Sequence, residues 1–142
     1  MPSAQHQVTI RRPLYEVFAF VADKANDPRW RPGIAEIERI SGEDAGAKYR
    51  QVIKGPGGRP IPADFEITVF EPGKRLAFRA TAGPVRPEGS FDFIEDGGAT
   101  QVTFKLDAEL AGAKKLMAPM VAKSMRNEVA SLDRLKQLLE TG

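Results

Sequence analysis

The spacing of hydrophobic positions changes several times along the chain, and each spacing predicts one type of element. In many segments apolar residues recur at every second position, which is the pattern of a strand with one buried face. One long segment of this kind, 61–69, places Phe65 and Ile67 in the apolar phase and Glu66 and Thr68 in the polar phase. Turn sequences rich in Gly, Pro and Asp separate the segments. Seven strands are therefore predicted, at residues 6–10, 34–41, 48–54, 61–69, 76–80, 85–93 and 101–108.

Apolar spacings of three and four residues predict helices after the first strand. Pro13 opens such a segment, which is expected to end near residues 22–24. A proline is well placed at the start of a helix because its missing N–H would have no partner there. Asn26-Asp27-Pro28 then signals a second helical turn over residues 29–31, before Pro32 breaks it. Two short helices are expected between the first and second strands.

The last part of the chain, residues 112–140, predicts one long amphipathic helix, with a kink or a restart at Pro119. At 100° per residue one stripe of this helix gathers mainly apolar side chains, namely Met117, Val121, Ser124, Met125, Glu128, Leu132, Leu135 and Leu139. Each of the seven strands has one apolar face that another element must bury, and this helix is the only one long enough. The sequence therefore predicts an α+β helix-grip fold, in which a curved antiparallel sheet wraps the helix. One helix face is narrower than seven strands, so an apolar cavity is expected between them.

The amino-acid composition excludes several kinds of functional site. A length of 142 residues suits a single domain, 1–142, and the absence of cysteine excludes disulfides, thiolate nucleophiles and thiolate metal sites. Lysine and arginine alternate with acidic residues, so the net charge of +2 indicates a solvated surface. Nucleic-acid binding is not expected, because the phenylalanines fall in the apolar phase of strands. Residues 1–7 lack the apolar run of a signal peptide and no later run is long enough to span a bilayer, which predicts a cytoplasmic protein.

Three motifs carry a family resemblance. They are Pro13-Leu14-Tyr15-Glu16-Val17-Phe18, Asp27-Pro28-Arg29-Trp30, and the closing run from Leu132 to Glu140. Together with the order of elements, they resemble the SRPBCC superfamily, which includes START-related lipid-binding domains, birch-pollen-allergen-like proteins and polyketide cyclases. The resemblance covers essentially the whole chain and implies a cavity for lipids, sterols, polyketides or other apolar molecules. These motifs mark a fold rather than an activity. Some members are hydroxylase subunits with iron, but with His6 as the single histidine no two-histidine metal site can form here, and no cofactor is expected.

Glu128 is the most informative polar residue, because it falls in the middle of the apolar stripe of the final helix. A buried carboxylate must be protonated, hydrogen-bonded or hydrated. It can therefore be a polar anchor or a general acid or base in the cavity, or a structural carboxylate paired with a strand residue such as Arg79 or Tyr49. The inward phase of the strands and the helix stripe give the remaining ligand-binding candidates, namely Tyr49, Gln51, Phe65, Ile67, Phe78, Phe91, Phe93, Phe104, Met117, Met120, Val121, Ser124 and Met125.

Other residues fit structural roles better. His6 lies at the start of a strand with no visible partner acid, which favours a surface or rim position over a catalytic one. Trp30 is expected to pack the short helices onto the sheet. Gly55, Gly57 and Gly58 form a turn, since no helix with the lysine of a phosphate-binding loop follows them.

Three functions remain open on the sequence. The first is a carrier or sensor that sequesters a small hydrophobic or amphipathic molecule in the cavity. The second is a polyketide cyclase or dehydratase in which Glu128 or Tyr49 moves protons while the cavity folds a reactive chain. The third is a module that docks a partner protein or a quinone. The sequence leaves the oligomeric state open, a homodimer included.

Overall fold

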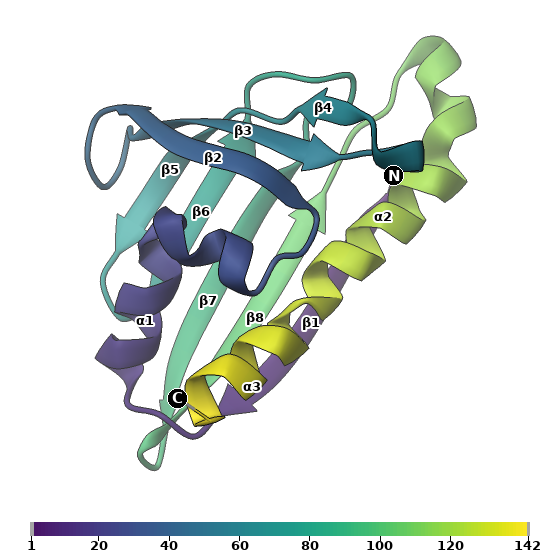
Figure 1. The fold of residues 1–142 in the computed structure, drawn as a ribbon. Coiled ribbons are helices and arrows are strands. Elements are labelled where there is room, and N and C mark those ends of the chain that lie inside the picture. The colour runs from purple at the N-terminus through teal and green to yellow at the C-terminus, as the bar shows by residue number, and fades with distance from the viewer. Residues whose placement is uncertain (1, 142) are drawn as a thin grey trace.

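One antiparallel sheet contains all the strands of the described residues. The computed structural model describes residues 2–141, so both end residues of the expected domain 1–142 lie outside the described part. The sheet has eight strands in the order β1-β8-β7-β6-β5-β3-β2, with β4 paired beside β3 (Figure 1). The strands are β1 (Ser3–Ile10), β2 (Ile34–Ser41), β3 (Lys48–Lys54), β4 (Pro60–Pro62), β5 (Phe65–Glu71), β6 (Arg75–Ala80), β7 (Glu88–Asp96) and β8 (Ala99–Asp107).

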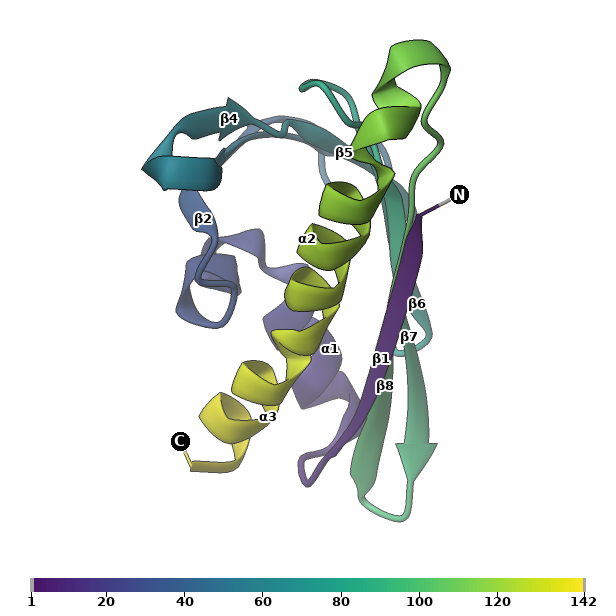
Figure 2. The same cartoon turned by 90° about the vertical axis from the view of Figure 1, so that its right-hand side faces the viewer.

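The helices lie on the concave side of this sheet. Figure 2 shows the C-terminal helices between β1 and β8 on one side and β2 and β4 on the other, so the curved sheet wraps around them. This arrangement confirms the predicted α+β helix-grip architecture. The helical elements are α1 (Leu14–Ala22), α2 (Ala118–Ala130) and α3 (Leu132–Thr141), with short 3₁₀ turns η1 (Lys24–Arg29), η2 (Pro56–Gly58) and η3 (Gly112–Met117).

The prediction of one continuous strand over residues 61–69 is wrong. The segment divides into β4 and β5, and the two residues between them, Ala63 and Asp64, leave the strand conformation. Pro60 and Pro62 have no N–H to give to a ladder, which keeps β4 short and at the margin of the sheet. At the bend, the carboxylate of Asp64 accepts a hydrogen bond from the backbone N–H of Gln51 at 3.2 Å.

Strand β5 also contains a bulge that changes which residues face inward. Its register with β6 shifts between Ile67 and Val69, so Phe70 rather than Val69 continues the inward phase. The Phe70 ring meets that of Phe18 on α1, with their centroids 5.5 Å apart. A bulge adds one residue to one strand and reverses the alternation beyond it, and simple alternation could not reveal this.

The single long C-terminal helix of the prediction is divided into three parts. The expected restart near Pro119 takes the form of the η3 turn, after which α2 begins at Ala118 with Pro119 in its first turn. A second break falls at Ser131, whose hydroxyl donates to the backbone carbonyl of Glu128. A serine hydroxyl that bonds to the preceding turn commonly bends a helix.

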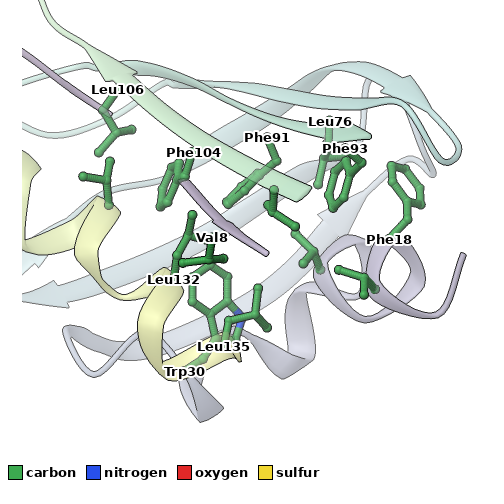
Figure 3. Close-up of a cluster of buried hydrophobic side chains, with 14 of the residues drawn as sticks. Val8, Phe18, Trp30, Leu76, Phe91, Phe93, Phe104, Leu106, Leu132 and Leu135 are labelled. Carbon is green, nitrogen blue, oxygen red and sulfur yellow. The ribbon is translucent and has the colours of Figure 1, made fainter. Parts of the chain in front are cut away.

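A cluster of buried hydrophobic side chains packs between the sheet, α1 and α3 (Figure 3). Phe18 packs edge-on against Phe93 with a centroid separation of 5.0 Å. Trp30, which follows η1, is fully buried, and its ring lies 6.1 Å from Phe91 and 6.4 Å from Phe104. This agrees with the packing role expected for Trp30. Among the described residues, no helix is both long enough and apolar enough to cross a membrane.

Polar contacts hold α3 to the first strand and to the segment that follows it. His6 Nε2 lies 2.9 Å from Asp133 Oδ1, so the histidine has a partner acid that the sequence did not reveal. Glu140 accepts hydrogen bonds from the Lys136 ammonium and the Arg11 backbone N–H, both at 2.8 Å, and these contacts lower its pKa from 4.5 to about 2. His6 does not line the cavity described below. Its contact with Asp133 holds α3 against β1.

Candidate functional site

A cavity of about 600 Å³ occupies the half of the concave side that α1 does not fill. It lies between α2 and the inner faces of β3 to β8, and the loop between β6 and β7 contributes one part of its wall. The residues that line it are Lys24, Arg31, Gln51, Ile53, Lys54, Gly55, Ile61, Pro62, Ala63, Phe65, Phe78, Ala80, Pro84, Val85, Pro87, Phe91, Phe104, Leu106, Met117, Met120, Val121, Lys123, Ser124, Met125, Asn127 and Glu128.

Four phenylalanine rings form the sheet wall of the cavity. Phe91 and Phe104 stack with their centroids 4.2 Å apart, and Phe78 lies 6.1 Å from Phe91 and 5.9 Å from Phe65. The position of Phe78 depends on its neighbour in β7, since a Cβ atom on Gly89 would lie 2.3 Å from the Phe78 ring. Such a continuous aromatic wall can bind the flat face of an aromatic ligand or the chain of a lipid.

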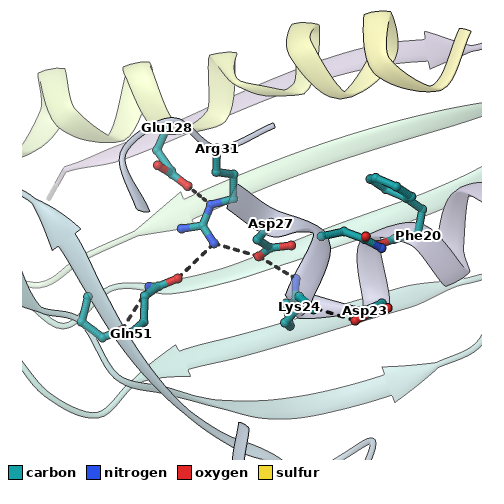
Figure 4. A network of polar contacts seen from close by, with 10 residues as sticks. Phe20, Asp23, Lys24, Asp27, Arg31, Gln51 and Glu128 are labelled. Carbon is teal, nitrogen blue, oxygen red and sulfur yellow. Dashed lines mark hydrogen bonds and ion pairs between the residues drawn. The ribbon is translucent and has the colours of Figure 1, made fainter. Parts of the chain in front are cut away.

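Five polar residues are connected at the cavity wall, and we call them the Arg31 cluster: Lys24, Arg31, Gln51 and Glu128, which line the cavity, and Asp27, which does not. Arg31 is at its centre (Figure 4). Its Nε donates to the Glu128 carboxylate, and its Nη1 donates to Asp27 at 2.9 Å and to Gln51 at 3.2 Å. Gln51 in turn donates to the carbonyl of Ala63 at 3.1 Å. The cluster therefore joins η1, β3 and α2 across the cavity.

Burial and ion pairing have opposite effects on the two cations of the cluster. Burial by itself lowers the pKa of Arg31, but the carboxylates of Glu128 and Asp27 outweigh it and the net shift is upward. For Lys24 burial dominates, and its pKa falls although Asp27 raises it. The difference follows from the geometry, because Asp27 Oδ2 is 2.9 Å from Arg31 but 3.5 Å from the Lys24 ammonium. Arg31 remains charged, whereas Lys24 is the cation whose charge is least compensated.

Most of the predicted site residues line this one cavity. They are Gln51, Phe65, Phe78, Phe91, Phe104, Met117, Met120, Val121, Ser124, Met125 and Glu128. Their role in binding remains a prediction. Glu128 pairs with Arg31 instead of the suggested Arg79 or Tyr49, since Arg79 bonds to Glu66 at 2.8 Å.

Three predicted residues lie outside the cavity wall. Tyr49 stacks on the far side of Phe65 with its ring 5.0 Å away, and burial raises the pKa of its hydroxyl. Phe93 is covered by Phe18 of α1, and Ile67 lies in the same packed core. The prediction had assumed that the C-terminal helix alone covers the sheet, but α1 and Trp30 fill the half of the concave side where Phe93 and Ile67 point.

Sequence reasoning missed Lys24 and Arg31, which contribute two charged groups to the cavity. Both stand in a short polar stretch with no apolar period, so no pattern marked them as inward-facing. Leu106 could have been found, because it continues the alternation of Phe104 along β8. Ile53 likewise shares the phase of Gln51 on β3.

The fold and this cavity together define a helix-grip protein of the SRPBCC superfamily, in agreement with the comparisons. The chain belongs to the polyketide cyclase/dehydrase and lipid transport family, whose model matches residues 1–140. A search of proteins with curated descriptions found no match.

Solved structures show the same fold at low sequence identity. A protein from Thermus thermophilus superposes with a TM-score of 0.80 at 23% identity, covering 94% of this chain and 92% of its own. The Zhui aromatase/cyclase from Streptomyces superposes with a TM-score of 0.72 at 18% identity, covering 96% of this chain and 88% of its own. A START superfamily protein from Mycobacterium smegmatis gives 0.74 at 12% identity, covering 96% and 98%. At these identities the likeness establishes the fold alone.

Proposed function

We propose that the protein binds a small hydrophobic or amphipathic molecule, such as a lipid or an aromatic polyketide, in the cavity between the sheet and α2, as a carrier or sensor. The main support is the cavity itself, whose volume of about 600 Å³ lies within the range of sites that hold drug-sized molecules. In this proposal residues 1–142 act as one ligand-binding domain in the cytoplasm, without a cofactor.

The distribution of polar groups supports an amphipathic ligand. The aromatic wall is apolar, and the Arg31 cluster provides the buried charged groups of the cavity, whereas the other two charged lining residues, Lys54 and Lys123, are exposed to solvent. A ligand with one polar end would place that end at the cluster and its apolar body along Phe78, Phe91 and Phe104. Apolar contact would then supply most of the affinity, and the cluster would set the orientation.

Filling the cavity tests this proposal. Ala80 lines the cavity from β6, so the indole of Ala80→Trp is expected to occupy the ligand space and weaken binding roughly tenfold or more. Binding of palmitate, a sterol and an anthraquinone can be measured by native mass spectrometry and by displacement of a fluorescent probe. Ala35→Trp is the matched control, because Ala35 is exposed on β2. If the native protein binds none of these molecules above background, or if both variants bind equally well, the proposal is wrong.

An enzyme of the cyclase or dehydratase type is the second candidate, and the Arg31 cluster is the observation that favours it. The cluster places the Glu128 carboxylate and the Lys24 amine on the cavity wall, where they could move protons on a confined substrate. Tyr49 has no such access because it lies behind Phe65. Glu128→Gln would leave binding nearly unchanged but abolish turnover of a reactive polyketide chain if this function holds. Unchanged turnover would rule out proton transfer by Glu128.

A further inference from the structure

Lys24, the lysine of the Arg31 cluster, occupies an unusual position for a lysine side chain. Its side chain is only 3% exposed, yet it contributes to the cavity wall. The ammonium lies over the face of Phe91, 4.9 Å from the ring centroid, so an aromatic surface of the cavity is directly beside it. Lysine is almost never fully buried without strong pairing, and the pairing here is weak.

The surroundings of the amine favour its neutral form. Its nearest carboxylate, Asp27, is also bonded to Arg31 at the shorter distance of 2.9 Å. Arg31 itself adds a repelling positive charge, and burial removes water from the ammonium; burial is the main reason why the pKa of Lys24 is lowered. A desolvated lysine near a second cation is the arrangement that turns a lysine into a nucleophile, because the neutral amine carries the lone pair.

We propose that Lys24 is a covalent attachment site, at which its Nζ condenses with an aldehyde or ketone of a ligand held in the cavity to form an imine. This inference rests on the proposed binding function and narrows the ligand class to apolar molecules that bear a reactive carbonyl.

The chemistry needs no further reactant. The Nζ lone pair forms a bond to the carbonyl carbon as the C=O π bond breaks, and proton transfer gives a carbinolamine. The carbinolamine then loses its oxygen as water, both of whose hydrogens come in net from the amine nitrogen, and C=N forms. No oxidant or reductant takes part. Asp27 is the nearest group able to accept and return the proton, since its Oδ2 is 3.5 Å from Nζ.

Two other lysines line the cavity and serve as internal controls. Lys54 and Lys123 are both exposed, so water solvates their side-chain nitrogens, whereas that of Lys24 is buried. All three lysines line the cavity that an aromatic aldehyde would enter. Only Lys24 offers it a desolvated nitrogen beside an aromatic wall.

The test is reductive trapping. The protein is incubated at pH 7 with 2-naphthaldehyde and cyanoborohydride, which reduces an imine to a stable secondary amine, and the modified lysines are mapped by peptide mass spectrometry. We expect Lys24 to be labelled about tenfold or more faster than Lys54 or Lys123. Excess 2-naphthylmethanol, which has the same ring but no carbonyl, should compete with this labelling. Lys24→Arg keeps the positive charge but cannot form the imine, and it should lose the adduct, whereas Lys54→Arg should keep it.

Binding of 2-naphthylmethanol to the unlabelled protein, followed by native mass spectrometry, separates the two claims. If the alcohol binds but Lys24 is labelled no faster than the exposed lysines, the attachment site is disproved and the binding function stands. If the alcohol does not bind and Lys24 is not labelled, both fail for this ligand class. The wild-type peptide map decides the result, so the test does not depend on the folding of any variant.

Discussion

Replacement of Arg31 by methionine is expected to lower the free energy of unfolding by about 3–5 kcal/mol, because removal of one partner leaves buried charges without compensation. Asp27 is fully buried and Glu128 is mostly covered, and Arg31 bonds to both. Without the guanidinium, the Asp27 carboxylate keeps, among the residues that the structure describes, only the Lys24 amine at 3.5 Å. Denaturation with urea, followed by circular dichroism, measures the change.

An exposed pair provides the control for this prediction. Arg50 lies 3.5 Å from Glu36 and 3.4 Å from Glu38 on the outer surface of β3 and β2. Exposed ion pairs contribute about 0–1 kcal/mol, so Arg50→Met should change stability very little. A loss below about 1 kcal/mol in Arg31→Met would mean that water reaches the Arg31 cluster from the cavity and screens it.

Trp30→Ala is the second substitution with a large expected effect, a loss of about 3–5 kcal/mol. The indole is 0% exposed and packs edge-on against Phe91 and Phe104, the stacked pair of the cavity wall. Its removal would open a void behind that wall and loosen it. The same urea titration gives the free energy, and Tyr15→Ala is the control, since Tyr15 is 69% exposed and should cost only about 0.5 kcal/mol or less.

Trp30→Phe distinguishes packing from hydrogen bonding. Among the described residues, Trp30 Nε1 has no hydrogen-bond partner. Replacement by phenylalanine therefore removes a buried N–H group without breaking a hydrogen bond. We expect its cost to be roughly half that of alanine or less. Equal losses in the two variants would show that the indole N–H carries the stabilisation, contrary to this account.

The alternation of apolar residues predicted much of the sheet from the sequence. The predicted limits of β2 and β3 match the structure, since both strands lie between clear turn signals. The final amphipathic segment correctly predicted the helix that the sheet grips. The alternation of apolar residues did not predict the irregular parts of the backbone, which are the β5 bulge beyond Ile67 and the bend between Pro62 and Phe65. Neither departure changes the hydrophobic period enough to be recognised in advance.

The site was harder to predict because its polar half depends on contacts between distant residues. Glu128 lines the cavity, and its role there stays a prediction; its partner Arg31 is 97 positions away in the sequence and lies in a stretch without periodicity. The pairing of His6 with Asp133 spans 127 positions and was missed for the same reason. Spacing within one element shows on which face a residue lies. Its contact partner from another element can be identified only in the three-dimensional structure.

The division of the concave side into a packed half and an open half has a functional consequence. Phe18 and Trp30 fill one half, so the stability of the core does not depend on filling the other half. Trp30 packs edge-on against Phe91 and Phe104, and this contact supports the aromatic wall in the absence of a ligand. A preformed wall of this kind reduces the ordering that binding requires.

Methyl NMR with isoleucine labelling tests the central claim, that a ligand enters the space under α2, most directly. Ile53 and Ile61 line the cavity, whereas Ile40 and Ile94 are 60% and 59% exposed on the outside of the sheet. On addition of 2-naphthylmethanol, the ring current should shift the methyl signals of Ile53 and Ile61 in a saturable way and leave those of Ile40 and Ile94 unchanged. Shifts confined to Ile40 or Ile94, or no shift at any isoleucine up to the solubility limit of the probe, would contradict the account.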